Sequence, residues 1–388
     1  MRSDLWDIRI VAGEGKYRIL RRLANRRHVL ATKLAITAFR YWFGRGETPK
    51  YGRIAFVKGP NQLRHHQYTE TLRNLRLGDL ETFSDKSHTA AINLFPRITT
   101  GQFCVLVMLA LCIFFRGRRR DVLAYLLVFY RAIQKITKTE LSDLEVFVCY
   151  NDQIFDVAAI VQALNRQGRC RTIVVQHGLV LSPDFYFPVN AQEFWSWGEL
   201  SRVHFRGRMP NCQFLVTGRY AEDRSIKALA PEIPELGERL VVLVAVSFNH
   251  GEIQEAVSEL VQIHDELSEE QRANVHFWIK FHPATRWRWK IRAILALQVP
   301  WLEVVDGDME KLAEQSDVLV TVNSSSLVDF LLRGKPVFRI FDRAPTSFPA
   351  SKCAFRLSDF KTIIAQERTC LERENVARLE FLKSALNV

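Results

Sequence analysis

Residues 316–342 decide the fold, and they read SDVLVTVNSSSLVDFLLRGKPVFRIFD. The pattern predicts a strand of β-branched and apolar residues, a turn of hydroxyl residues, a short helix and a second strand. Gly334 and Pro336 end the helix, because glycine tolerates the left-handed conformation found after many helices and proline cannot continue one. The predicted bounds are 318–322 and 337–341 for the strands and 327–333 for the helix.

The turn between this strand and helix carries three serines, Ser324, Ser325 and Ser326. Backbone N–H groups at a helix start lack partners within the helix, so together with hydroxyl groups they form an anion site. In open α/β sheets, ligands bind beyond the carboxyl ends of the strands. We therefore expect these serines to hold a phosphate-bearing ligand. Asp329 lies one turn further on the same helical face, where its carboxylate would either bind a ribose or sugar hydroxyl or help to cap the turn.

The rest of the chain alternates between strands and helices from about residue 53 onward. Strands separated by helices predict βαβ units and a parallel sheet. The other predicted strands are 53–58, 145–150, 171–176, 193–197, 213–217, 240–246, 275–281 and 302–305. The predicted helices are 68–77, 155–167, 251–269, 289–297 and 309–315, with a helical tail from about 358 to 386.

A segment rich in proline and charge, 229–239, predicts a linker between two halves. We therefore expect an α/β chain with two Rossmann-like domains that face a cleft, at 51–230 and 231–388. A basic helical segment, 1–50, would precede the first domain, and a helical insertion near 100–140 would interrupt it.

Histidines follow two of the predicted strands. His177 comes directly after the strand 171–176 and before a glycine, where its imidazole would serve as a general base in the cleft. His282 follows the strand 275–281, which Pro283 ends, and Lys280 lies two residues earlier on the same face. A histidine and a lysine together suit a diphosphate. The alternatives are a core histidine for His177 and a simple strand ending for His282.

Weaker signals lie at three further strand ends. Asn249 belongs to a polar loop that leads into a glycine and a helix, a usual place for phosphate contacts. Gly218 and Arg219 follow the strand 213–217, where a plain loop is an equal alternative. Asp152 follows the strand 145–150 and would either contact the acceptor, assist a base or cap the next helix.

The composition favours an anionic partner. The chain has 388 residues, of which 48% are hydrophobic and 25% charged, with a net charge of +12 and a pI of about 9.5. Nucleic acid, anionic lipid and a phosphorylated substrate would all suit this charge. No zinc-finger spacing or RNP motif is present, so nucleic acid is not expected. The seven cysteines form no C-x-x-C pair, which predicts buried, reduced thiols in a cytosolic protein without a secretory signal.

The strongest apolar run, 103–115, has 13 residues, short of the roughly 20 that span a bilayer. Four arginines follow it (Arg116, Arg118, Arg119 and Arg120), and a second apolar run covers 122–130. Two interpretations stay open: buried helices of the first domain, or a pair of helices docked on anionic headgroups. The basic amphipathic pattern of 18–42 is open in the same way, between a membrane surface and a solvated face packed on the domain.

These motifs, in this order, resemble the GT-B glycosyltransferases of bacterial surface polysaccharides. The nearest likenesses are to teichoic-acid glycerophosphotransferases and capsule polysialyltransferases. The resemblance covers about 145–342 and rests on Gln176-His177-Gly178, Thr217-Gly218, Lys280-Phe281-His282-Pro283, Ser316-Asp317, the three serines and Gly334-Lys335-Pro336. The first 140 residues show no such likeness.

The resemblance implies an inverting, metal-independent transfer from a nucleotide-activated sugar or polyol donor, without a cofactor. It implies that His177 is the base, that His282 contacts the donor phosphate and that the serines hold the phosphate or nucleotide. The chain lacks the acidic-acidic-Gly motif of the sialyltransferases in its N-terminal half, which moves the base onto His177. No Asp-x-Asp element stands out for a metal-dependent alternative.

The acceptor would be a polysaccharide or a lipid-linked chain, and the expected location is cytoplasmic, with docking on the inner membrane left open. A UDP-N-acetylglucosamine 2-epimerase-like enzyme is the second hypothesis, although such enzymes usually carry a serine-glycine-glycine turn where this chain has three serines. The third is a non-catalytic, membrane-associated assembly partner.

Overall fold

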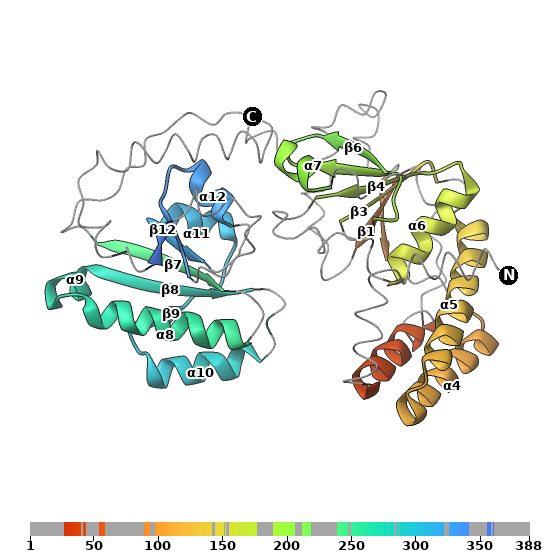
Figure 1. Cartoon of the computed structure of the whole chain (residues 1–388), viewed down its shortest axis with the longest axis horizontal. Helices are drawn as coiled ribbons and strands as arrows, with labels where there is room; N and C mark the ends of the chain where they lie inside the picture. The colour runs from red at the N-terminus through yellow and green to blue at the C-terminus, as the bar shows by residue number, and fades with distance from the viewer. Residues whose placement is uncertain are drawn as a thin grey trace. The chain divides into compact units, whose positions relative to one another are not determined.

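The computed structural model has two compact α/β units (Figure 1). Unit 1 comprises the described residues up to Thr217 except 198–201, and unit 2 comprises 198–201 and the described residues from Gly218 on. The structure describes residues 27–39, 42–43, 54–58, 89–93, 98–141, 144–150, 152, 155–176, 189–205, 212–218, 239–246, 250–282, 285, 287–321, 326–340, 355–357 and 360.

Unit 1 holds a six-stranded parallel sheet in the order β2-β1-β3-β4-β5-β6. Its strands are β1 (Ile54–Lys58), β2 (Thr89–Asn93), β3 (Val146–Cys149), β4 (Arg171–Val175), β5 (Glu193–Ser196) and β6 (Gln213–Val216). The residues of β5 are all buried, as are all but the first of β3 and β4. Strands covered on both faces have continuous apolar runs, which is why the sequence marks them clearly.

The described helices of unit 1 are a helix at 27–39, α4 (Thr100–Arg116), α5 (Arg119–Glu140), α6 (Phe155–Gln167) and the larger part of α7 (Glu199–Phe205), whose first three residues belong to unit 2. A capping box of Thr99 and Gln102 starts α4. Gly117 ends α4 in the left-handed region, at a φ of 61°, and its N–H donates to Ile113. This tight turn allows α5 to pack back against α4 and α6.

Unit 2 holds a second six-stranded parallel sheet, in the order β12-β11-β10-β7-β8-β9. Its strands are β7 (Leu240–Val246), β8 (Val275–Phe281), β9 (Leu302–Val304), β10 (Val318–Thr321), β11 (Val337–Arg339) and β12 (Phe355–Arg356). Its helices are α8 (His250–Glu266), α9 (Glu269–Asn274), α10 (Arg288–Gln298), α11 (Met309–Gln315) and α12 (Leu327–Leu332).

Helices cover both faces of this sheet: α8 and α10 lie on one side, and α11 and α12 on the other (Figure 1). Alternate residues of β7, among them Val242 and Val244, pack with Ile253 and Leu260 of α8 in one buried cluster. This alternation follows from the two-residue repeat of a strand. The result is a doubly wound layer structure, as the alternating pattern predicted.

Sequence analysis predicted most of these elements, and the α/β class with two Rossmann-like sheets is confirmed. The predicted helix 251–269 is wrong at its end, because α8 stops at Glu266 and Ser268 caps a separate helix, α9. The strands β2 and β12 and the helix α7 were not predicted. The predicted helices 68–77 and 358–386 and most of the linker 229–239 fall on residues outside the described ranges.

The helix α4 is buried on one face only, through Leu106, Ala110 and Ile113. Both interpretations of 103–115 stay open, because one face of α4 is buried while Val105, Met108, Leu111 and Phe115 are exposed. In the described part of the chain, no helix is long and apolar enough to cross a membrane. Cys104 on α4 is exposed, so the prediction that the cysteines are buried is wrong at this position.

Candidate functional site

The carboxyl ends of β10, β7 and β8 lie next to one another in unit 2. β7 comes first in the chain, β8 and β9 extend the sheet on one side, and β10 and β11 extend it on the other. Ligand crevices form where the strand order reverses in this way. At this point Thr321 of β10 donates its hydroxyl to the carbonyl of Ala245 in β7, at 3.0 Å. This edge is the candidate donor site.

Two of the predicted donor residues lie at the end of β8, where Lys280 is the last residue but one and His282 follows the strand. His282 is exposed as a residue, yet desolvation, followed by the positive charges of Lys280 and Arg288, lowers its pKa. A lowered pKa favours the neutral imidazole near pH 7, until an anion offsets the neighbouring charges.

Arg288, the first residue of α10, was not among the predicted site residues. A signal for it was present in the alternating basic and aromatic residues that follow Pro283. With Lys280 and His282 it places three basic groups at the end of one strand. Such a group can receive the negative charge of a phosphorylated ligand.

The start of α12 carries two further predicted residues. Ser326 is the N-cap and Asp329 lies in the first turn, as their spacing predicted. Both residues are buried, at 5% and 8% exposure. The two interpretations of Asp329, a cap and a contact with a ligand hydroxyl, both stay predictions. Gly334, at a φ of 69°, ends the turn after α12, as predicted.

Five predicted site residues lie outside the described residues: His177, Ser324, Ser325, Asn249 and Arg219. The strands before them are described and end at the predicted residue or one residue before it: β4 at Val175, β10 at Thr321, β7 at Val246 and β6 at Val216. Gly218 is described, and its positive φ of 81° gives the turn after β6 a conformation that suits glycine. The roles of these residues stay predictions.

Asp152 has partners that the sequence did not indicate. It is 2% exposed, and its Oδ2 accepts hydrogen bonds from the backbone N–H groups of Asn190 and Ala191, the latter at 2.9 Å. The side-chain amide of Asn190 donates in return to the carbonyl oxygen of Asp152, at 3.0 Å. These bonds tie the turn after β3 to the segment that leads into β5, which is a structural role.

We expect Asp152→Asn to reduce the pH dependence of stability. Burial raises the pKa of Asp152 from 3.8 to about 7, although backbone hydrogen bonds oppose the shift. Because the pKa of Asp152 is higher in the folded protein, its protonated carboxyl stabilises the fold fully below the pKa of the unfolded chain. This stabilisation is lost as the pH rises through about 7. The Tm should fall between pH 5 and pH 8 more steeply in the wild type than in the variant, whose amide oxygen still accepts both N–H bonds. Equal slopes in thermal unfolding would contradict this.

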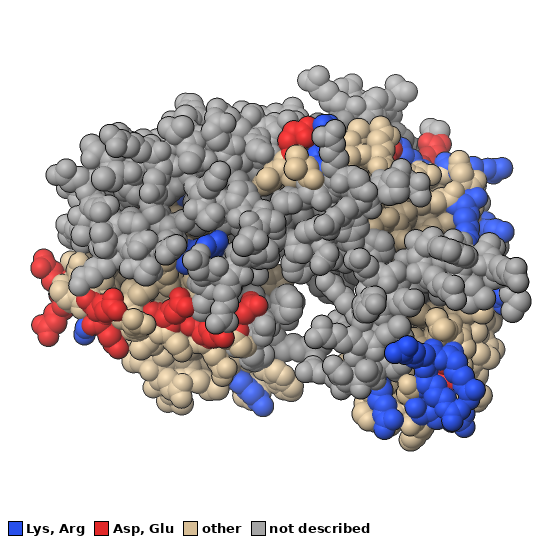
Figure 2. All heavy atoms as spheres, viewed as in Figure 1, with Lys and Arg blue, Asp and Glu red and all other residues tan. Residues whose placement is uncertain are grey.

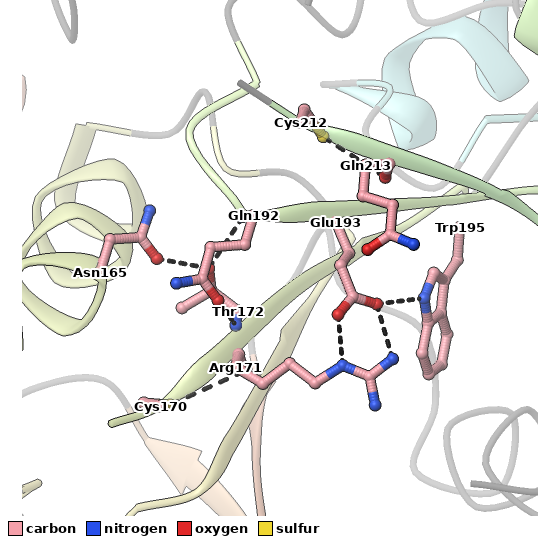
Figure 3. A network of polar contacts seen from close by, with 9 residues as sticks. All are labelled: Asn165, Cys170, Arg171, Thr172, Gln192, Glu193, Trp195, Cys212 and Gln213. Carbon is pink, nitrogen blue, oxygen red and sulfur yellow. Dashed lines mark hydrogen bonds and ion pairs between the residues drawn. The ribbon is translucent and has the colours of Figure 1, made fainter. Parts of the chain in front are cut away.

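A charged network lies at the amino ends of the strands in the unit 1 sheet, away from their carboxyl ends (Figure 3). Arg171, the first residue of β4, and Glu193, the first of β5, form a two-pronged ion pair, in which Nη2 donates to Oε2 at 2.8 Å. The indole N–H of Trp195 donates to the same Oε2 at 2.9 Å, and the guanidinium lies 5.7 Å from the indole ring centre. Its place away from the carboxyl edge makes this network structural.

Two of the motifs that carry the resemblance, Gly334-Lys335-Pro336 and Ser316-Asp317, lie at the amino ends of the strands in unit 2. The Lys335 Nζ donates to three carbonyls at the end of α11, those of Ala313, Glu314 and Ser316, at 2.7 to 3.0 Å. The Asp317 carboxylate accepts from the N–H of Val241 at 2.7 Å and so joins β10 to β7. Both residues hold the sheet together and do not face the candidate donor site.

The sequence does contain one Asp-x-Asp element, Asp306-Gly307-Asp308. It follows β9. The Asp306 Oδ2 accepts from Arg292 at 2.6 Å, and Asp308 is the N-cap of α11. In the parts of the chain that the structure describes, no three histidine, cysteine or acidic side chains come together as metal ligands.

No family model matches this chain, and a search of curated proteins finds no match. Among solved structures, the chain is similar to a trehalose-6-phosphate protein from E. coli bound with UDP-2-fluoro glucose, with a TM-score of 0.52 and 8% identity over 86% of this chain and 96% of that one. The chain has a GT-B fold.

Two further structures resemble this GT-B chain less closely. UDP-GlcNAc 2-epimerase from Methanocaldococcus jannaschii, in complex with UDP-GlcNAc and UDP, has a TM-score of 0.48 and 10% identity over 84% of this chain and 98% of that one. The wall teichoic acid polymerase TagF, in a variant soaked with CDPG, has a TM-score of 0.45 and 11% identity over 97% of this chain and 93% of that one. The likeness to capsule polysialyltransferases is not shown and stays a prediction.

Proposed function

We propose that this GT-B chain is a transferase that takes a sugar or polyol phosphate from a nucleotide-activated donor and adds it to a surface polysaccharide or a lipid-linked acceptor. The observation that carries the proposal is the carboxyl edge of the unit 2 sheet. There His282 and Lys280 end β8, and Ser326 and Asp329 follow the end of β10, beside the point where the strand order reverses.

The edge has the charge that such a donor requires. A leaving nucleoside phosphate gains negative charge as its bond to the transferred group breaks. Lys280 and Arg288 are positive, and His282 becomes a better donor of hydrogen bonds when it takes a proton. The helix α8 begins at His250, soon after β7 ends, and its amino end adds partial positive charge. These groups stabilise the leaving phosphate.

The acceptor half of the proposal rests on His177. An attacking hydroxyl must lose its proton, and an imidazole with an ordinary pKa near 6.5 can accept it. The direct displacement of the nucleotide by this hydroxyl inverts the transferred sugar. The E. coli protein that shares the fold binds a UDP-sugar, which supports a nucleotide-sugar or related donor for this chain.

His282→Ala should weaken nucleotide binding by about tenfold, because it removes one hydrogen bond to a charged phosphate. The test is the thermal shift of the full-length protein with CMP, CDP, UDP and GDP. Because anion binding favours the protonated imidazole, the wild type should bind a diphosphate more tightly as the pH falls from 8 to 6, and the variant should lose this dependence.

His276→Ala is the matched control, since His276 is the second residue of the same strand and lies at its other end. It should keep the wild-type shift. If none of the four nucleotides stabilises the chain, or if both histidine variants respond as the wild type does, the donor site is wrongly placed. Stabilisation by UDP together with epimerisation of a UDP-sugar would favour the epimerase hypothesis instead.

A further inference from the structure

An apolar groove runs between the helix 27–39 and α4 in unit 1. Its volume is about 680 Å³. One face of each helix lines it, since the lining residues recur every three or four positions. Small residues on both walls, Ala31, Ala35 and Ala110, leave the hollow open. The larger lining residues are Ile36, Phe39, Phe43, Phe103, Val107, Leu111 and Phe114.

Apolar side chains beside the groove face the solvent. On α4, Met108 and Phe115 are 67% and 69% exposed, and on the other wall Ile36 and Phe39 are 47% and 49% exposed. Scattered apolar residues on a surface need no explanation, but a contiguous patch of this kind marks an interaction surface.

Arginines gather at one end of this groove. His28 contacts Phe114 there, with ring centres 4.4 Å apart, and the side chain of Arg27 packs against Gly117. The turn from α4 to α5 adds Arg116, Arg118, Arg119 and Arg120. Figure 2 shows Lys and Arg atoms gathered where α4 and α5 lie in Figure 1.

The same surface has almost no opposing charge. Neither α4 nor the helix 27–39 contains an acidic residue, and Asp121 is the first one in α5. Arg120 lies 3.9 Å from Asp121, and Arg116, Arg118 and Arg119 add three further positive charges to the same turn. In an anionic bilayer, negatively charged headgroups lie directly beside apolar acyl chains. A positive turn beside an apolar surface can contact both layers at once.

The dimensions favour helices that lie on a bilayer over helices that cross it. The 17 residues of α4 extend over about 25 Å, less than the roughly 30 Å of a hydrocarbon core. The groove spans the 12 residues from Phe103 to Phe114, which extend over roughly 16 Å, comparable to part of one acyl chain. A second copy of this chain would fit poorly, because it would bring the same arginines together.

We propose that the helix 27–39 and α4 form a docking surface for the leaflet of a bilayer rich in anionic lipid. The arginine turn contacts the phosphates, Met108 and Phe115 enter the headgroup boundary, and the groove takes part of an acyl chain. This inference does not depend on the proposed function, because a bilayer can bind the surface whether or not unit 2 holds a nucleotide.

The test is sedimentation of the full-length protein with vesicles of phosphatidylcholine and 30% phosphatidylglycerol, in low salt and in 0.5 M NaCl. The wild type should bind these vesicles, should bind pure phosphatidylcholine far less, and should be released by salt. Arg119→Glu with Arg120→Glu should weaken binding by more than the roughly fivefold expected for each lost arginine, because two negative charges are added. Met108→Asp with Phe115→Asp should weaken it as well.

Arg169→Glu is the control, because Arg169 is exposed and lies after α6, away from the groove. The substitution changes the net charge by as much as Arg119→Glu or Arg120→Glu does alone. It should bind as the wild type does, apart from a small general effect of charge. Circular dichroism should show that all variants stay folded, as expected for exposed positions. Failure of the wild type to bind the anionic vesicles, or equal binding by all variants, would overturn the proposal. A dimer in light scattering that Met108→Asp dissociates would show that the surface binds a second copy instead.

Discussion

His177→Ala is expected to lower the rate of transfer by roughly 10² to 10⁴-fold, the usual range for loss of a general base. His177 follows β4, whose end is firmly placed. The backbone N–H of Gln176 donates to Trp195, and its side-chain oxygen accepts from the N–H of Trp197, both at 2.9 Å. Gln176 is 1% exposed, so the residue directly before His177 is anchored between β4 and β5.

The measurement is transfer from the nucleotide donor that the thermal-shift screen identifies. The stabilisation of His177→Ala by that nucleotide should match the wild type, because the base acts on the acceptor and the nucleotide binds in unit 2. The two histidine variants should therefore differ. His282→Ala should bind the nucleotide more weakly, whereas His177→Ala should lose turnover and bind the nucleotide as the wild type does. Full activity in His177→Ala would remove the proposed base, and loss of both binding and activity would indicate a structural role.

Glu193→Ala is expected to lower the free energy of unfolding by about 1–3 kcal/mol in all, because the Arg171 side chain is 41% exposed and the ion pair is only partly buried. Glu193 is 7% exposed and accepts from both Arg171 and Trp195. Its removal leaves the indole N–H of a fully buried tryptophan without this partner, which is a further cost. The hydrogen bond to Glu193, against partial desolvation and with a smaller effect of the carboxylate charge, raises the pKa of Arg171, which is consistent with a paired guanidinium.

Urea unfolding of the two variants Glu193→Ala and Glu145→Ala provides the measurement and its control. Glu145 directly precedes β3 and is exposed, so its removal should change stability by less than about 1 kcal/mol. Arg171→Ala should cost less than Glu193→Ala, because its side chain is 41% exposed and water can replace part of the pair. A loss of under 1 kcal/mol in Glu193→Ala would show that the network adds little to the fold.

The strands and helices of unit 2 were predictable because each leaves a local signal. The strand β7 is a continuous apolar run, and α11 and β8, like α6 in unit 1, have the bounds that the sequence predicted. The break between α8 and α9 was missed, since the helical pattern continues through Leu267 while the serine after it starts a new cap. The short strand β12 has two residues, too few for a repeat to be visible.

The candidate site was predictable in part for the same reason. His282 and Lys280 could be placed from the end of one strand, without knowledge of its neighbours. Asp152 could not, because its partners Asn190 and Ala191 are 38 and 39 residues away and belong to the approach to another strand. Lys335 and Asp317 were quoted with the site motifs, yet they bind carbonyl and N–H groups at the amino edge.

By itself, the sequence determined the α/β class, the order of most of the elements and, to within about two residues, where the predicted strands end, because these depend on repeats and turn residues within a few positions. The tertiary structure decided which strands lie side by side, which carboxylates are held by distant N–H groups and where two helices leave an apolar groove. Those features depend on contacts between residues far apart in the chain. A local sequence pattern does not specify which distant residue a side chain contacts.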